Sequence, residues 1–496
     1  MKFNPNPVLL GVTLDRSLSF GPHTSNVAER VSGKVNILAA LSHSDWECKR
    51  DHLKAVYQCS VRSILDYGGA GWQPWLKQCN IGTLERAQNK ALGRITGQHV
   101  GSPFGSKNLE SGIPTYETII NRNCLKAQEK GLRLPSDHPR NIAFTTNIPP
   151  RNTRHSCASR AMELTEQLDT NVTNRKPITL FPITAPWEDA CEISIFDYVP
   201  GVVKPTDDWV SKQEATIKRI HELAADCNYI IYTDGSASEG RLNGGAAAVV
   251  TIGTADAPIV ITTLLERGGS LTCSYEEEST ALELAANWMQ EHCAQDSRVL
   301  ICTDSKSICQ KLNGNSIIIA DLRQLLFSVP GTVIIQWVPG HSDVPGNELA
   351  DEAAKAATSI QAVSRPISYS SVCSYINLMI VDKPFPHPRP NQAYHGKTRK
   401  QEDRITTRAD QVLLACLRSG KHKAFRNYQH ALDGFTDPSC PRCQEPLHTL
   451  EHWLLDCPGT REAVFRMYGF LPTTLGVMST HTRETVALAR ATLLAP

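Results

Sequence analysis

The segment YIIYTDGSAS, residues 229–238, decides the fold of the central part of this 496-residue chain. Its β-forming residues lead directly to Asp234, and turn-forming residues follow. The pattern recurs in VLICTDSKS, residues 299–307, where a β-forming run ends at Asp304. Two such runs in one sheet would bring carboxylates that are distant in sequence to the same end of that sheet.

The sequence around these two segments predicts a single α/β domain over residues 220–360. The expected strands are 229–233, 246–252, 259–265, 299–303 and 332–338, and the expected helices are 278–292, 305–312, 319–327 and 347–357. The order β-β-β-α-β-α-β-α predicts a five-stranded mixed sheet with flanking helices, with an antiparallel meander first and parallel pairing after it.

Two further acidic residues lie in predicted helices. Glu278 comes three residues before Ala281 and seven before Ala285, so it lies on the helix side that faces the sheet. A carboxylate there is costly unless a metal or a partner satisfies it. Its neighbours Glu276 and Glu277 read as solvated charges, although either could exchange roles with Glu278.

Asp351 lies off the apolar stripe of its predicted helix, near Lys355. Glu348 or Glu352 could take its place in a site. The alternative for Asp351 is an ordinary ion pair with Lys355 at spacing i,i+4.

These carboxylates together predict a metal site. Clustered carboxylates repel one another and persist in a fold chiefly when a divalent cation neutralises them. Oxygen ligands suit Mg²⁺ or Mn²⁺, the ions of phosphoryl-transfer chemistry. A metal-dependent phosphodiesterase is therefore the leading interpretation.

Charge is unevenly distributed, although the net formal charge is only +1. Residues 228–357 contain 7 basic and 16 acidic residues, whereas residues 394–430 contain 9 basic and 3 acidic residues. An acidic catalytic segment needs basic neighbours to hold a polyanion.

The sixteen cysteines are mostly scattered without paired spacing. No secretory signal pattern is visible at the start of the sequence, and no apolar run approaches the roughly 18 residues of a membrane span. We expect reduced cysteines and an intracellular protein without a membrane partner, in the nucleus or the cytoplasm.

One cysteine group has metal-ligand spacing. The segment PSCPRCQEPLHTLEHWLLDCPG, residues 438–459, contains Cys440, Cys443, His452 and Cys457. This spacing predicts a tetrahedral zinc site in a small module, residues 440–457, with His448 as the alternative histidine ligand. A segment this short cannot bury a core, so we expect the metal to supply most of its folding free energy.

The remaining sequence suggests further regions. Residues 1–135 are mainly helical, residues 136–215 form an irregular linker, and residues 361–395 form a second linker. Residues 396–496 form a basic helical region that contains the zinc module. Its candidate phosphate contacts are Arg404, Arg408 and Lys421; the alternative is a solvated basic helix face.

Four phrases carry a resemblance to a known family: TDGSA (233–237), SYEEE (274–278), TDSKS (303–307) and WVPGHSDVPGNELADEAA (337–354). Together they resemble type 1 ribonuclease H, in the version found near the C-terminus of non-LTR retrotransposon polyproteins. The resemblance implies four metal-binding acids: Asp234, Glu278, Asp304 and Asp351. It also implies that His341 helps to protonate the leaving group or speeds product release.

The activity implied by this resemblance is hydrolysis of the RNA strand of RNA–DNA hybrids. Two Mg²⁺ ions about 3.5–4 Å apart would bracket the scissile phosphate. The hybrid would be recognised by shape and 2′-hydroxyl groups, with contacts from Gly235, Ser236 and Ser274. Few basic residues lie between Asp304 and Thr332, so we expect tight binding to need the basic flanking segments.

Two other regions resemble parts of the same polyproteins. The cysteine-histidine segment is similar to their CCHC zinc module. LLGVTLDRSLSFGPH (9–23) and VRSILDYGGAGWQPWL (61–76) resemble the thumb or connector region that follows the polymerase palm of non-LTR reverse transcriptases. The palm motif is missing, so we expect a truncated element without polymerase activity. The alternative function is a catalytically decayed protein that binds RNA or DNA; no protein partner is indicated.

Overall fold

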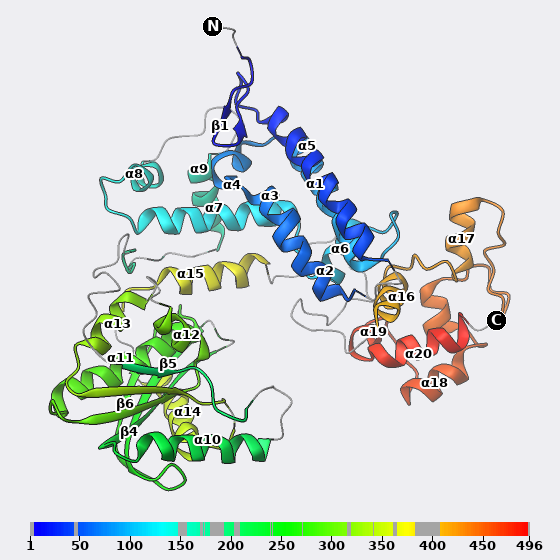
Figure 1. Ribbon diagram of the computed structural model, residues 1–496. Helices are drawn as coiled ribbons and strands as arrows, with labels where there is room; N and C mark the ends of the chain where they lie inside the picture. The colour runs from blue at the N-terminus through cyan, green and yellow to red at the C-terminus, as the bar shows by residue number, and fades with distance from the viewer. Residues whose placement is uncertain are drawn as a thin grey trace. The chain divides into compact units, whose positions relative to one another are not determined.

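The structure is a computed structural model, and its elements are labelled in Figure 1. It describes residues 4–43, 48–146, 156–168, 172, 174–178, 193–202, 209–238, 240, 242–269, 271–314, 319–340, 342–360, 365–381 and 407–494. The chain divides into two compact units. The first comprises Met1–Gln128, Asn147–Leu168 and Leu378–Pro496, and the second comprises Glu129–Thr146 and Asp169–Asn377.

A six-stranded mixed sheet forms the centre of the second unit, in the order β3-β8-β7-β4-β5-β6. The pairs β4–β5 and β5–β6 are antiparallel, whereas the pairs β4–β7, β7–β8 and β8–β3 are parallel. The strands are β3 (Ile193–Phe196), β4 (Tyr229–Ser238), β5 (Leu242–Gly253), β6 (Pro258–Arg267), β7 (Arg298–Thr303) and β8 (Thr332–Trp337).

The prediction of five strands is wrong, because β3 adds a sixth strand at the edge of the sheet. β3 pairs in parallel with β8, with Ile193 opposite Val333. It lies within residues 136–215, which were predicted to be an irregular linker. Four residues give too short a pattern to stand out from Pro-, Thr- and Asn-rich surroundings.

Helices cover both faces of this sheet (Figure 1). Because successive strand residues point to opposite faces, Ile231 packs with one helix layer and Ile230 with the other. The first layer contains α11 (Ser274–His292), α12 (Lys306–Asn313) and α13 (Ala320–Phe327); the second contains α10 (Trp209–Ala224) and α14 (Pro345–Ala357). Burial of each large aliphatic side chain contributes about 1.5–3 kcal/mol to this arrangement.

Two short helices, α8 (Pro139–Thr145) and α15 (Tyr369–Ile376), also belong to the second unit. The Arg133 guanidinium links the segments of this unit that flank the sheet domain. It donates hydrogen bonds to the carbonyl oxygens of Lys176 and Ser368, at 2.9 and 3.3 Å.

The first unit is mainly helical, as predicted for the N-terminal region. Its N-terminal elements are β1 (Val8–Leu9), β2 (Val12–Thr13), α1 (Gly21–Leu41), α2 (Arg50–Tyr57), η2 (Gln58–Arg62), α3 (Ser63–Asp66), α4 (Gly69–Trp72), η3 (Gln73–Trp75), α5 (Gln78–Thr96), α6 (Phe104–Ser111), most of α7 (Tyr116–Leu132) and α9 (Cys157–Leu168). Its later elements are α16 (Arg408–Arg418), α17 (Arg426–Asp433), η7 (His452–Asp456), α18 (Arg461–Tyr468), α19 (Val477–Thr480) and α20 (Thr482–Thr492), and η5 (Asn377–Val381) crosses the boundary between the units.

Buried arginines join the two halves of the first unit. Arg408 donates hydrogen bonds to the carbonyl oxygens of Arg94 and Ile95, at 2.8 and 2.7 Å, and so caps the C-terminal end of α5. Arg418 is fully buried and forms an ion pair with Glu110 of α6 at 3.2 Å. Parts of the predicted regions 1–135 and 396–496 therefore share one compact unit.

None of the helices described here is long and apolar enough to cross a membrane.

Candidate active site and metal centres

Two parallel strands at the centre of the sheet, β4 and β7, bring the first two carboxylates together. In the register of β4 and β7, Thr233 lies opposite Thr303. Each threonine immediately precedes an aspartate, so Asp234 and Asp304 lie side by side at the C-terminal end of β7, while β4 continues to Ser238. The β-forming runs thus bring together carboxylates that are 70 residues apart in sequence.

Close packing of α11 on β4 adds the third carboxylate. A Cβ atom at Gly235 would overlap the backbone nitrogen of Glu278 and would lie 2.9 Å from the Cβ of Glu277. Glycine therefore lets the start of α11 approach the strand. Carboxylate oxygens of Asp234, Glu278 and Asp304 lie within 4.8 Å of one another.

Burial and mutual repulsion perturb these acids strongly. Burial raises the pKa of Asp234 to about 7, and the charges of Asp304 and Asp351 add to the effect. Burial, with the charges of Asp304 and Asp234, raises the pKa of Glu278 well above its ordinary value. Each group therefore favours its protonated form until a cation compensates the charge.

The arrangement fits a divalent cation. Oε2 of Glu278 is buried and has no hydrogen-bond partner within the described part of the chain. An unsatisfied buried carboxylate oxygen beside two other carboxylates is costly without a cation. Asp234, Glu278 and Asp304 are thus the residues that would hold Mg²⁺ or Mn²⁺.

Asp351, on α14, lies at the margin of this group. Its charge contributes to the raised pKa of Asp234, but its carboxylate is not within the group of three. Instead, its Oδ2 accepts a hydrogen bond from Nζ of Lys355 at 2.5 Å. The structure therefore contains the i,i+4 ion pair and also keeps Asp351 close enough to influence the site.

Of the three neighbouring glutamates on α11, the structure brings only Glu278 into the acidic cluster. Glu277 points elsewhere and accepts a hydrogen bond from the hydroxyl of Thr272. With 2% exposure, Glu277 is buried, so the interpretation of this residue as a solvated charge is wrong. Burial raises the pKa of Glu277 to about 7.

Four other residues were predicted for this site: His341, Gly235, Ser236 and Ser274. His341 lies outside the described residues; the preceding Gly340 passes close to Asp304, because a Cβ built there would lie 2.9 Å from Oδ2 of Asp304. Gly235 and Ser236 are half-buried on β4, and Ser274 is the half-buried first residue of α11.

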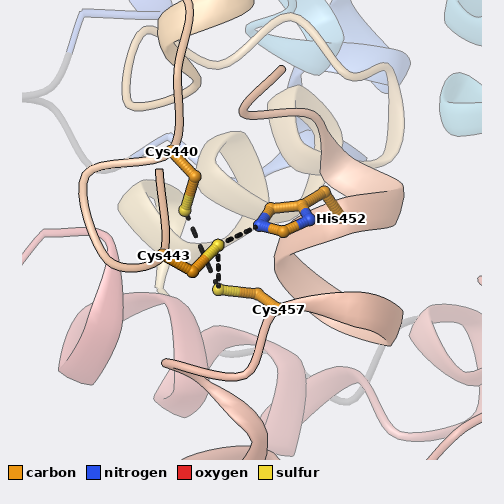
Figure 2. Close-up of side chains that lie close together, drawn as sticks. All are labelled: Cys440, Cys443, His452 and Cys457. Carbon is orange, nitrogen blue, oxygen red and sulfur yellow. Dashed lines mark hydrogen bonds between the residues drawn. The ribbon is translucent and has the colours of Figure 1, made fainter. Parts of the chain in front are cut away.

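A second group of metal-ligating side chains lies in the first unit. Figure 2 shows the side chains of Cys440, Cys443, His452 and Cys457 directed toward one another, and their ligand atoms all lie within 4.8 Å. Sγ of Cys443 is 3.1 Å from Nε2 of His452, and Sγ of Cys457 is 3.8 Å from both other sulfur atoms. Three thiols and one imidazole are the ligand types that hold Zn²⁺ in tetrahedral structural sites, so this group fits Zn²⁺.

Of the two candidate histidines, the structure places His452 in this group. His448 is buried beside the ring of Phe425, and its Nδ1 accepts a hydrogen bond from the backbone N–H of Arg426. Burial, with the charge of His452, lowers the pKa of His448 to about 4. His448 thus has a packing role separate from the cysteine group.

The backbone around Cys440 favours a thiolate. Burial opposes ionisation, but hydrogen bonds from the backbone N–H groups of Arg442 and Cys443 lower the pKa of Cys440 below its ordinary value. Gln444 follows with a left-handed φ of 61°, and its N–H donates to the carbonyl oxygen of Cys440 at 2.9 Å. This tight turn brings Cys440 and Cys443 to the same side of the loop.

An apolar core lies beside the cysteine-histidine group. Trp453 and Leu454 of η7 are buried in a cluster with side chains from α16, α18 and α20. Nε1 of Trp453 donates a hydrogen bond to Oγ1 of Thr492 at 2.9 Å. The expectation that this segment buries no core is therefore wrong, because its apolar residues share a core with neighbouring helices. The contribution of a metal to its folding stays a prediction.

The three predicted phosphate contacts in the basic region are not equivalent. Arg404 lies outside the described residues. Arg408 is 4% exposed and caps α5, so its prediction as a phosphate contact is wrong in this structure. Lys421 holds its ammonium 4.9 Å from the centre of the Tyr428 ring, a cation–π contact at the surface of the first unit.

Comparison with protein families identifies the central segment. Residues 226–359 match the family described as RNase H. These residues form an RNase H domain. The match spans β4 to α14 and includes all four predicted acids.

The RNase H domain also has structural relatives with low overall scores. One is the N-terminal RNase H domain of a Mycobacterium tuberculosis protein, solved as a fusion with maltose-binding protein: identity is 22%, the TM-score is 0.23, and the match covers 26% of this chain and 92% of that one. Another is RNase H1 of the halophilic archaeon Halobacterium salinarum NRC-1, with 19% identity, a TM-score of 0.22, and coverage of 26% and 96%. A search of curated proteins found no match.

Proposed function

We propose that the RNase H domain hydrolyses the RNA strand of RNA–DNA hybrids with Mg²⁺ or Mn²⁺. The observation that supports this most directly is the convergence of Asp234, Glu278 and Asp304 within a segment that matches the RNase H family. Asp234 and Glu278 are buried, and their raised pKa values are typical of groups prepared for a cation, not of a surface charge cluster.

In this proposal each residue has a defined role. Asp234, Glu278 and Asp304 bind a pair of divalent ions. Asp351 becomes the fourth ligand when its carboxylate is released from, or shared with, the ion pair with Lys355. Such ions, when bound, supply a water nucleophile and stabilise the charge on the departing oxygen. His341 donates a proton to the 3′ oxygen, and Gly235, Ser236 and Ser274 contact the hybrid backbone and its 2′-hydroxyl groups.

We infer two further properties from the resemblances. The set of Cys440, Cys443, His452 and Cys457 binds one Zn²⁺, and the chain derives from the C-terminal part of a non-LTR retrotransposon polyprotein. The convergence of the four ligand atoms supports the zinc site. The polyprotein origin is supported by the order of the motifs along the sequence.

The competing proposal is a catalytically decayed protein that binds RNA or DNA through its basic and zinc regions. The presence of all four acids favours the enzyme, because a decayed site has no requirement for the costly burial of Asp234 and Glu278 beside other carboxylates.

Cleavage of a labelled RNA–DNA hybrid separates the two proposals. We expect the wild-type chain to cut the RNA strand in Mg²⁺ and not in EDTA, and we expect Asp304→Asn to lower the rate by at least about 100-fold. The matched control is Asp296→Asn, an exposed aspartate of the same domain, which should retain the wild-type rate. Hybrid binding by the wild-type chain without any cleavage would support the decayed protein.

A further inference from the structure

Glu277 is a buried acid for which the proposed reaction has no role. Its Oε1 accepts the hydrogen bond from Thr272, and its Oε2 has no hydrogen-bond partner in the described ranges. A buried carboxyl group costs free energy that an aliphatic side chain at the same place would not cost. The burial of Glu277 beside Glu278 therefore needs a compensating role.

Two glycines form a cradle for the carboxyl group of Glu277. Gly244 lies on β5 and Gly268 directly follows β6, and the N–H of Gly268 donates to the carbonyl oxygen of Gly244 at 2.9 Å. A Cβ atom at either glycine would overlap the carboxyl group of Glu277. The side chain thus fills a space that exists only because both positions lack side chains.

This anchoring acts on the first turns of α11. Adjacent residues of an α-helix point about 100° apart around its axis. When Glu277 is held against the ends of β5 and β6, the rotation of the helix start is fixed, and Glu278 is directed toward Asp234 and Asp304. The close approach of Gly235 to both glutamates fixes the height of the helix above β4.

We propose that Glu277 is a positioning residue that holds Glu278 in its metal-binding orientation through Thr272 and the cradle of Gly244 and Gly268. This inference rests on the proposed function of the acidic cluster. Outer residues that orient metal ligands typically change metal affinity by about 10–100-fold when they are removed.

The test measures Mg²⁺ affinity directly, by calorimetry on the full chain at 25 °C, beside hybrid cleavage. We expect Glu277→Ala to weaken Mg²⁺ binding by about 10-fold or more and to lower the cleavage rate, with the KM for the hybrid nearly unchanged. Glu277→Gln should restore affinity to within a few-fold, because its amide oxygen can still accept from Thr272. Thr272→Val should weaken binding in the same direction as Glu277→Ala.

Two further variants make the result interpretable. Glu276→Ala changes the half-buried neighbour on the same turn and should keep wild-type Mg²⁺ affinity. Asp234→Asn removes a proposed ligand and sets the affinity expected for a damaged site.

The inference is overturned if Glu277→Ala only lowers the melting temperature and binds Mg²⁺ as tightly as wild type. If Glu277→Ala does not fold, unchanged affinity in both Glu277→Gln and Thr272→Val would support a role of the Glu277 carboxylate in folding alone. Equal Mg²⁺ binding by wild type and Asp234→Asn would instead contradict the proposed metal site, and the positioning role with it.

Discussion

At the scale of single residues, the acidic cluster links protonation to stability. The pKa of Asp234 is raised from 3.8 to about 7, first by burial and then by Asp304 and Asp351. A folded-state pKa above the unfolded value means that the folded chain binds the proton more tightly. The corresponding stability is fully present below the unfolded pKa and is lost as the pH rises through about 7.

We therefore expect the metal-free chain to become less stable between pH 4 and pH 8, by up to about 4 kcal/mol from Asp234 alone. Denaturation in EDTA across this range checks the prediction. Asp234→Asn should flatten the pH dependence, and Mg²⁺ should stabilise the chain most at the alkaline end, where the carboxylates are ionised. A pH dependence that is identical in wild type and Asp234→Asn would contradict the assignment.

The roles of side chains in this site can be predicted from the sequence only in part. Helix phase was sufficient to favour Glu278 over its neighbours, because Ala281 and Ala285 mark the buried side of α11. The role of Glu277 could not be found in this way. Its cradle is built by Gly244 and Gly268, and a run of three glutamates is typical of a solvated helix end.

At the scale of elements, the cysteine-histidine group combines a tight turn with the π-helix η7. The turn presents Cys440 and Cys443, and η7 begins at His452 and ends just before Cys457. Spacing alone does not decide whether His448 or His452 is the metal ligand. Their separation depends on the packing of His448 against Phe425, which sequence spacing does not encode.

His452→Ala should therefore remove or greatly weaken bound Zn²⁺, whereas His448→Ala should retain it with some loss of stability. The measurement is zinc content after dialysis, together with the absorption spectrum of the Co²⁺-substituted chain, which reports thiolate and imidazole ligands. Loss of metal in His448→Ala with retention in His452→Ala would reverse the ligand assignment.

Some strands of the sheet can be predicted from their own sequence, whereas β3 depends on its pairing partner. The turn predicted directly after Asp234 is wrong, because β4 continues to Ser238 and pairs there with β5. The runs of β-forming residues that lead to Asp234 and Asp304 could nevertheless be predicted, because each is continuous. β3 could not, because its four residues become a strand only by pairing with β8. Short edge strands depend on tertiary pairing more than on their own composition.

At the scale of the whole molecule, the first unit is held together by charges buried between distant segments. The carboxylate of Glu110 on α6 forms ion pairs with Arg50 at 2.7 Å and with Arg418 at 3.2 Å. The guanidinium of Arg418 also donates a hydrogen bond to the carbonyl oxygen of Met478 at 2.8 Å. The sequence alone does not predict this cluster, since more than 300 residues separate Glu110 from Arg418 and no periodicity connects them.

Breaking this cluster should destabilise both halves of the first unit. We expect Glu110→Gln to cost about 3–5 kcal/mol, because it leaves two buried guanidinium groups without a carboxylate. Hydrogen exchange should increase together in α1, α5 and α16. The exposed pair of Glu462 and Arg466 is the matched control, and Glu462→Gln should change stability by less than about 1 kcal/mol. Increased exchange confined to one half would contradict a shared core.

The discontinuous make-up of the first unit has a consequence during synthesis. Its early helices leave the ribosome well before α16 to α20, because the sheet-containing unit is encoded between them. At about 5–20 residues per second, the nearly 280 residues from Gln128 to Thr407 take roughly 14 to 56 seconds to translate. During that interval the nascent early half exposes the surfaces that later contact Arg408 and Arg418.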